Sequence, residues 1–172
     1  NMSYTVAESD QYNQAINYAY NNGVTIVCAS GNYSSELIYP ASHESTIAVG
    51  AIDSLNYKAT VSNYGSGLDL VAPGVVIWST ARSNDNYYGF DSGTSFSAPH
   101  ITGVVALMLS VNPNLTPDEI RSILNGTAQK INPNTYLYNN SGWNVSVGYG
   151  LVDAYAAVIA ARDYSISGPP VV

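Results

Sequence analysis

The feature that most constrains the fold is a charge-free apolar run that directly follows a turn rich in glycine and serine. The run covers residues 101–109, and Thr102 carries its only polar side chain. A helix without a polar face must be buried on all sides, so we expect this segment to form the central helix of the protein. Pro99 suits the first turn of that helix, where a missing N–H costs nothing. Ser95 is therefore expected at or just before the N-terminus of a buried helix.

A serine at this position can serve one of two purposes. The free N–H groups and the dipole at a helix N-terminus favour negative charge, which suits a serine that acts as a nucleophile. The same serine can also simply cap the helix. Local chemistry alone leaves both interpretations open for Ser95.

The residues around Ser95 favour the first interpretation. From Gly93 to His100 the chain has the sequence Gly-Thr-Ser-Phe-Ser-Ala-Pro-His, which resembles the nucleophile motif of the subtilisin-like serine proteases. It is not the Gly-x-Ser-x-Gly motif of the α/β-hydrolases, because position 97 is serine. The resemblance implies an α/β fold, with a three-layer, mostly parallel sheet that carries helices on both faces. It also implies that the N-terminal strands of the sheet lie outside this chain.

A second motif follows a predicted strand. Residues 24–29 form a continuous apolar run, as expected of a parallel strand covered on both faces, and Gly31 and Asn32 come directly after it. A polar amide at the carboxyl end of a strand fits the usual position of α/β active sites. Gly31-Asn32 also suits an ordinary turn. The resemblance implies that Asn32 and the backbone N–H of Ser95 form the oxyanion hole.

The resemblance assigns further residues to the site. Thr94 is expected to support the oxyanion. One wall of the main specificity pocket is expected to contain Ala29, Ser30 and Gly31, and the other Ser3 and Tyr4. Two departures alter the expected shape of this pocket: Thr5 stands where the family usually has glycine, and the connection from Asn32 to Tyr39 is short. Phe96 replaces the usual methionine after the nucleophile.

The chain does not supply a complete catalytic triad. The family order is Asp, His, Ser, so both partners of Ser95 are expected upstream of this chain. Of the two histidines, His100 is expected to be a core residue bonded to a backbone carbonyl, and His43 to belong to the structure of the substrate pocket. We therefore predict that the intact protein is a serine endopeptidase and that this chain alone is inactive. The alternatives are a pseudo-protease or structural fragment and, less favoured because it uses Asp where this chain has Asn32, a sedolisin-type carboxyl protease.

Composition limits the partners and the location. The chain has only five Lys and Arg residues and a net charge of −7, which argues against nucleic acid as a partner. A surface made polar by tyrosine, asparagine and serine rather than by charge suggests a secreted or cell-surface protein. No signal peptide or membrane-spanning run is evident. The implied partners are a peptide or protein substrate and the missing N-terminal part of the domain. Without that part, an open sheet edge and apolar surface on the central helix are expected to cause self-association.

No cofactor is expected, apart from one weak structural cation. By resemblance, Asp69 could help to hold Ca²⁺ or Na⁺ near Ala41 and His43. Its carboxylate could equally accept hydrogen bonds within a turn. The resemblance also implies a cis peptide bond between Tyr39 and Pro40, and Cys28 is expected to be a buried thiol.

The remaining patterns predict one domain over residues 1–162 and a linker over residues 163–172, which is rich in glycine and proline at its end. The predicted elements begin with a helix over 9–21, a strand over 46–52 and an antiparallel pair over 59–62 and 68–74 around a glycine-rich turn. Residues 72–80 continue the family resemblance and lead into a surface loop over 82–91. A helix is expected from Thr116 to about Leu124, ended by Asn125-Gly126. A surface loop over 130–147 follows, and a last helix begins at 148–153 and runs through Ala161.

Overall fold

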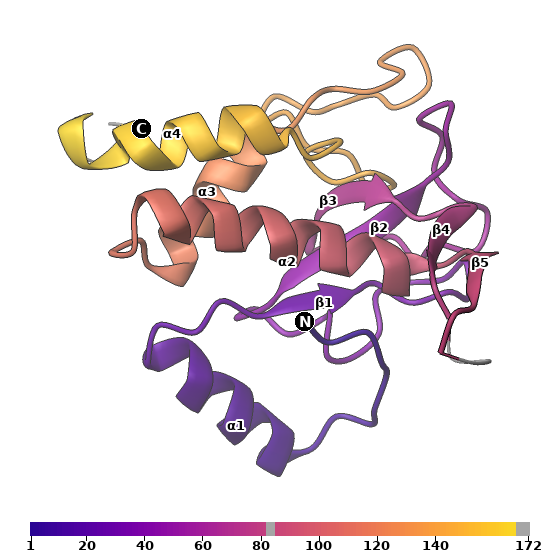
Figure 1. The fold of residues 1–172 in the computed structure, drawn as a ribbon, viewed down its shortest axis with the longest axis horizontal. Helices are drawn as coiled ribbons and strands as arrows, with labels where there is room; N and C mark the ends of the chain where they lie inside the picture. Colours follow the sequence, from indigo (N-terminus) through magenta and orange to yellow (C-terminus); the bar gives the residue numbers. More distant parts are fainter. Residues whose placement is uncertain (82–84, 168–172) are drawn as a thin grey trace.

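The computed structural model describes residues 1–81 and 85–167, and it has the predicted α/β architecture (Figure 1). Three parallel strands form the central sheet in the order β1-β2-β3, with α1 on one face and α2, α3 and α4 on the other. A separate two-stranded sheet pairs β4 with β5. The elements are α1 (Asp10–Asn21), β1 (Val27–Ala29), β2 (Ile47–Ile52), β3 (Leu68–Pro73), β4 (Ile77–Thr80), β5 (Tyr88–Asp91), α2 (Thr94–Val111), α3 (Pro117–Thr127) and α4 (Ala154–Ser167).

The core lies between the central sheet and α2. Strands β1 and β2 are buried along their whole length, as their apolar sequences predict. Side chains of α2, such as Ile101 and Met108, pack in one cluster with Val49 and Leu70 of the sheet. The same cluster includes Ala157 of α4, so α2 is held between the sheet and the last helix. This packing places the N-terminus of α2 at the carboxyl ends of the strands.

Within the described residues the central helix is not buried on all sides, and the expectation of exposed apolar surface on this helix is confirmed. Leu107 is 54% exposed and Val111 is 41% exposed, and His100 on the same side is also exposed. The sheet and α4 cover two sides of α2, and within the described residues no element covers the third. By length and composition α2 would also suit a membrane span, but seven of its side chains are buried within the protein. Composition alone could not show which side lacks a neighbour.

The predicted antiparallel pair is also wrong. Residues 59–62 form no strand, and β3 pairs parallel with β2, for example Val49 with Leu70. The glycine-rich segment before β3 therefore reverses the chain without forming a hairpin. The hairpin lies later, where Tyr88–Asp91 of the predicted surface loop forms β5 against β4. The rings of Trp78 and Phe90 contact across it, with centroids 4.6 Å apart. The rest of that predicted loop includes residues 82–84, which lie outside the described part of the chain.

Three helix boundaries differ from those expected. The capping box of Thr116 and Glu119 starts α3 as predicted, but the helix continues through Asn125 and Gly126. A glycine is tolerated there because this helix is held by its buried side chains rather than by propensity. The last helix begins only after Asp153, which accepts a hydrogen bond from the N–H of Ala156. It extends to Ser167, so the predicted linker begins inside a helix, and its residues 168–172 lie outside the described part of the chain.

Ser9 caps α1 through a hydrogen bond from the N–H of Tyr12. Two local predictions are confirmed. The Tyr39-Pro40 peptide bond is cis. Cys28 is fully buried, and burial raises the pKa of its thiol to about 11, although a hydrogen bond with Thr46 opposes the shift. The single cysteine is therefore a protonated core residue at neutral pH.

Candidate active site

Ser95 and Asn32 line the same cavity. Asn32 follows the end of β1, and Ser95 is the second residue of α2, so both lie at the carboxyl edge of the central sheet. The cavity has a volume of about 190 Å³. Its lining residues are Ser3, Tyr4, Thr5, Ala29, Gly31, Asn32, Tyr33, Thr94 and Ser95. Seven of the eight predicted site residues are thus in one place, although they come from three separate parts of the chain.

The side chain of Asn32 is held in a fixed orientation. Its Oδ1 atom accepts hydrogen bonds from the backbone N–H of Thr94 at 2.9 Å and from the Thr94 hydroxyl at 3.0 Å. Since Oδ1 is fully used, Nδ2 is the end of the amide that remains available to donate. A Cβ atom at Gly93 would lie 3.2 Å from this Nδ2 atom, so the glycine leaves space for the amide.

Thr94 supports the site by holding Asn32. Its side chain is completely buried, and its hydroxyl donates to Asn32 and accepts from the N–H of Gly31 at 3.2 Å. It thereby joins the end of β1 to the start of α2. We expected Thr94 to support the oxyanion, and in the structure its hydroxyl acts through the orientation of Asn32.

Pro99 gives the start of α2 an additional contact. The sequence predicted this proline in the first turn of the helix, but the proline lies in the second turn. Because proline has no N–H, the carbonyl of Ser95 lacks its usual partner within the helix. That carbonyl accepts a hydrogen bond from the Ser3 hydroxyl at 3.1 Å instead. The N-terminal segment is thereby attached beside the nucleophile.

Neither histidine of the chain lines the Ser95 cavity. His100 Nδ1 lies 2.7 Å from the carbonyl oxygen of Phe96, as expected, but the side chain is exposed and not part of the core. His43 Nδ1 accepts from the N–H of Ser45 at 3.1 Å, and its ring packs against Tyr39. Within the described residues the Ser95 hydroxyl takes part in no hydrogen bond. Among the described residues, the side chains that line the cavity can stabilise negative charge beside Ser95, and they include no His, Asp, Glu or Lys.

Ser30 does not line the cavity, contrary to expectation. It is completely buried, and its hydroxyl lies 3.3 Å from the carbonyl oxygen of Asn63. Successive residues of an extended segment point to opposite sides, so Ala29 and Gly31 face the cavity and Ser30 faces away. This alternation could have been applied to the sequence directly.

Sequence reasoning missed two contributors to the cavity. Tyr33 lines it directly, beside the predicted Asn32. Asn63 is fully buried, and its Oδ1 atom accepts hydrogen bonds from the N–H groups of Tyr33 and Ser35. This amide fixes the short connection after Asn32. Nothing near Asn63 in the sequence indicates the role, because its partners lie about thirty residues away.

Asp69 has a different environment from both of those proposed for it. It lies in β3, not in a turn, and its carboxylate accepts from Arg121 Nε at 2.8 Å and from the N–H of Ala48 at 2.8 Å. Burial alone would lower the pKa of Arg121, but the hydrogen bond and charge of Asp69 raise it overall. The carboxylate that was expected to help to hold Ca²⁺ or Na⁺ is thus paired with the guanidinium of Arg121. The described residues contain no cluster of three or more His, Cys, Asp or Glu side chains able to hold a metal ion.

An α/β fold with a serine at a helix N-terminus, opposite an oriented amide, defines a candidate hydrolase site. The family model of the subtilases matches residues 1–150, so this chain belongs to the subtilase family. It is 43% identical over 145 residues to the thermophilic serine proteinase of Bacillus sp. (strain AK1), covering 84% of this chain and 33% of that protein. It is 42% identical over 145 residues to subtilisin BL of Lederbergia lenta, covering 84% of this chain and 49% of that protein.

A solved structure agrees with these relatives. The chain is similar, with a TM-score of 0.80 and 33% identity, to a structure described as proteases from Pseudoalteromonas arctica PAMC 21717. The similarity covers 92% of this chain and 50% of the other. The chain therefore spans between a third and a half of the length of the relatives it matches.

Proposed function

We propose that the intact protein is a serine endopeptidase that cleaves peptide bonds through an acyl-enzyme, with Ser95 as the nucleophile. The observation that carries the proposal is that Asn32 and Ser95 line one cavity, with the Asn32 amide oriented by Thr94. Support also comes from the family and from relatives whose names describe serine proteinases and subtilisins. The sedolisin alternative is less well supported, because that class uses Asp at the position of Asn32.

The residues of this chain supply the proposed nucleophile and the hydrogen bonds that stabilise the oxyanion. Ser95 Oγ forms a bond to the carbonyl carbon of the substrate, and the negative charge moves to the carbonyl oxygen. Asn32 Nδ2 and the backbone N–H of Ser95 donate hydrogen bonds to that oxygen. The Ser95 proton passes to a base and then to the leaving amine, after which water releases the acyl group by the same route. By family resemblance, the base is a histidine upstream of this chain, oriented by an aspartate.

A serine-directed fluorophosphonate tests the assignment. The intact protein is expected to be labelled rapidly and stoichiometrically at Ser95, and Ser95→Ala to abolish the labelling. The 172-residue chain alone is expected to remain unlabelled, because we propose that the base of Ser95 lies upstream of this chain. We also propose, from its low charged fraction of 10%, that the protein is secreted. The labelled species is then expected in the culture medium. Rapid labelling of the isolated chain would show that the base lies within it.

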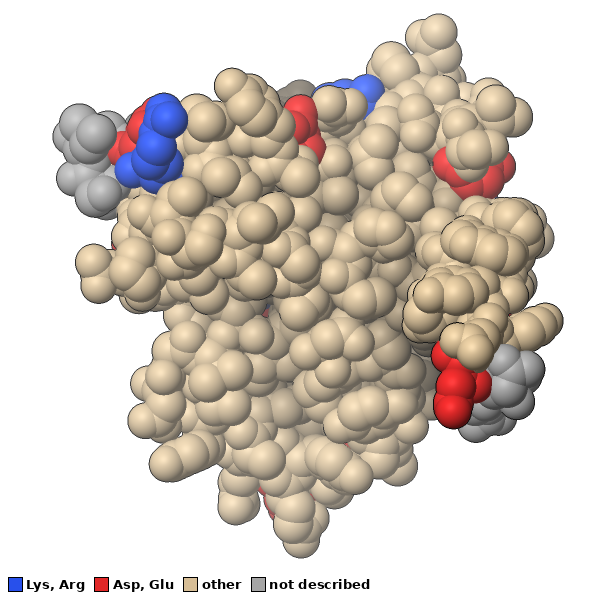
Figure 2. Space-filling model, viewed as in Figure 1, with Lys and Arg blue, Asp and Glu red and all other residues tan. Residues whose placement is uncertain are grey.

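We further propose that the exposed side of α2 and the edge of β1 are covered by the N-terminal part of the same domain. Met2 is the only residue of the described chain that bridges to the outer side of β1. The face of the molecule that includes α2 carries few charged side chains (Figure 2). Without a covering segment, these surfaces favour contact between copies.

The 172-residue chain alone is therefore expected to self-associate in sedimentation velocity measurements. Leu107→Lys places a charge on the exposed side of α2 and is expected to shift the chain toward the monomer. Leu137→Lys is the matched control, because Leu137 is 79% exposed in the long loop that precedes α4. A monomeric wild-type chain, or an equal effect of both substitutions, would contradict the proposal.

A further inference from the structure

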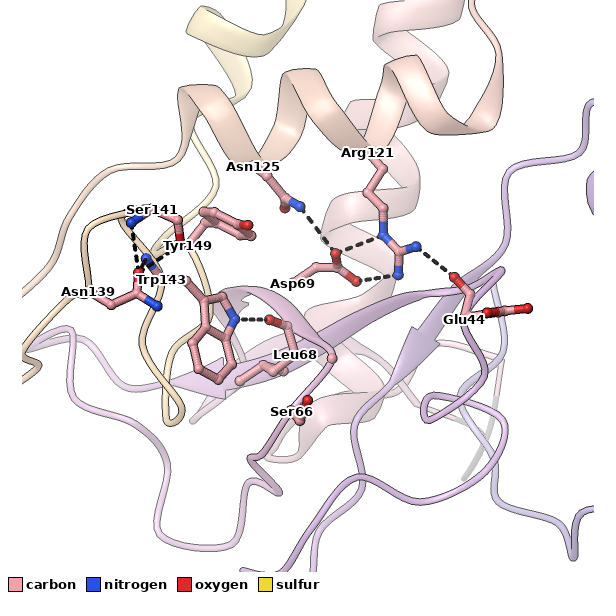
Figure 3. Close-up of a pocket in the computed structure, with 11 residues that line it drawn as sticks. Glu44, Ser66, Leu68, Asp69, Arg121, Asn125, Asn139, Ser141, Trp143 and Tyr149 are labelled. Carbon is pink, nitrogen blue, oxygen red and sulfur yellow. Dashed lines mark hydrogen bonds and ion pairs between the residues drawn. The ribbon is translucent and has the colours of Figure 1, made fainter. Parts of the chain in front are cut away.

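A groove lies on the opposite edge of the sheet from Ser95. It consists of two adjoining cavities between α3 and the loop 139–149. The first has a volume of about 550 Å³ and is drawn in Figure 3, and the second has a volume of about 570 Å³. Asn125, Ser141 and Tyr149 line both cavities, which makes them one continuous groove. Both volumes lie in the range of about 300–1,000 Å³ that is usual for small-molecule sites. The groove begins at Leu68, the first residue of β3, and shares no lining residue with the Ser95 cavity.

The cavity of about 550 Å³ has a rigidly held aromatic ring, that of Trp143, as its floor. Trp143 Nε1 donates to the carbonyl oxygen of Leu68 at 2.8 Å, which fixes the orientation of the indole. Asn139 Oδ1 fixes the loop from the other side, since it accepts from the N–H of Trp143 at 3.0 Å and from the N–H and hydroxyl of Ser141. The ring is therefore in place before any ligand binds, which lowers the entropic cost of binding.

Uncommitted hydrogen-bonding groups surround this ring. The hydroxyls of Ser66 and Tyr149 and the Nδ2 atom of Asn139 line the cavity, and none of them is hydrogen-bonded within the described part of the chain. They provide both donors and acceptors on the sides of an aromatic floor. Such a combination recognises a ligand with an apolar face and a polar edge.

The charges of the groove favour a neutral ligand. Arg121 cannot readily hold an anion, because its donors are used by Asp69 and by the backbone carbonyls of Glu44 and Thr46. A cation is disfavoured by Lys130, whose ammonium lies 5.5 Å from the centre of the Tyr149 ring and donates to the carbonyl oxygen of Gly142. A positive charge is thus already present at the Tyr149 ring, on the side of the second cavity.

We propose that this groove binds a neutral oligosaccharide, with one pyranose ring stacked on Trp143. The C–H face of a sugar ring matches the indole, and its hydroxyls match the free groups of Ser66, Asn139 and Tyr149. The second cavity accommodates the next ring of the chain. A saccharide bound in the groove leaves the Ser95 cavity free. The groove can therefore hold a glycan-bearing or polysaccharide partner while Ser95, at the other edge of the sheet, carries out the proposed peptide cleavage.

Isothermal titration of the intact protein with cellotetraose, maltotetraose and chitotetraose tests the proposal. The protein carries Ser95→Ala to prevent self-digestion. At least one of the three sugars is expected to bind, and Trp143→Ala to weaken that binding about tenfold or more. Tyr149→Phe, which removes only a hydroxyl and preserves the ring, is expected to weaken it several-fold. Trp78→Ala is the matched control, because Trp78 is the other tryptophan of the chain and lies on the β4-β5 hairpin.

Three outcomes would overturn the proposal. The first is that no sugar binds at concentrations up to about 10 mM, where even a weak site would be occupied. The second is binding that neither Trp143→Ala nor Tyr149→Phe weakens relative to Trp78→Ala. The third is a response to tetramethylammonium chloride in place of the sugars, which would identify a cation site. Because the readout is binding to an inactive variant, failure here leaves the proposed peptidase function unaffected.

Discussion

Replacing Asn32 with aspartate is expected to lower kcat of the intact protein by about 10²–10³, the loss measured for the corresponding amide of a subtilisin. The carboxylate of Asp can still accept the two hydrogen bonds from Thr94 that orient Asn32. It cannot donate to the oxyanion, and it places a negative charge beside the oxygen that becomes negative. KM is expected to change little, because the lost interaction forms mainly in the transition state.

Two comparisons make this measurement specific. Asn114→Asp makes the same chemical change on an exposed turn after α2 and is expected to leave kcat unchanged. Thr94→Val removes the hydroxyl that holds Asn32 and Gly31, and is expected to lower kcat by a smaller factor than Asn32→Asp. If Asn32→Asp keeps kcat within about fivefold of the wild type, Asn32 is not the oxyanion donor.

The position of the site could be predicted because its main residues stand next to strong local signals. Ser95 precedes the apolar run of α2, and Asn32 follows the apolar run of β1. Each run determines a buried element, and the ends of buried elements in an α/β fold meet at one edge of the sheet. The family resemblance then supplied the role of each residue. Local pattern and motif thus agreed on the same cavity.

Most of the errors have one cause: the correct placement depends on contacts with residues far away in the sequence. The carboxylate of Asp69, for example, meets Arg121, 52 residues later. Ser30 is an exception, because the alternation of an extended segment could have been applied to the sequence. A glycine-rich turn before β3 is compatible with either strand direction, and only the tertiary fold chooses the parallel one. The exposed side of α2 is equally invisible, since an apolar helix has the same sequence whether or not a neighbour covers it.

The groove around Trp143 illustrates the same limit for loops. The segment 130–147 was predicted only as a polar and aromatic surface loop. In the structure the indole N–H of Trp143 reaches the backbone of Leu68, 75 residues earlier, and turns the loop into the wall of a cavity. Aromatic residues in a polar loop are therefore a reason to look for a binding surface, but the sequence does not show which backbone they face.

Replacing Arg121 with leucine is expected to lower the free energy of unfolding by about 3–5 kcal/mol, because it leaves a buried carboxylate without its counter-charge. Asp69 is only 6% exposed, and Arg121 contacts both of its oxygens, at 2.8 Å and 3.0 Å. The N–H of Ala48 and the amide of Asn125 would remain as partners, but neither carries a charge. The carbonyls of Glu44 and Thr46 would also lose their donor.

Urea denaturation of the intact Ser95→Ala protein measures this loss from the shift in midpoint at constant slope. Arg162→Leu is the matched control, since it breaks an ion pair with Asp163 whose side chains are 58% and 49% exposed. That change is expected to leave the midpoint almost unchanged, because water already solvates both groups. Combining Arg121→Leu with Asp69→Asn removes the buried charge itself and is expected to recover part of the loss. Equal effects of Arg121→Leu and Arg162→Leu would show that burial of Asp69 does not make its ion pair important for stability.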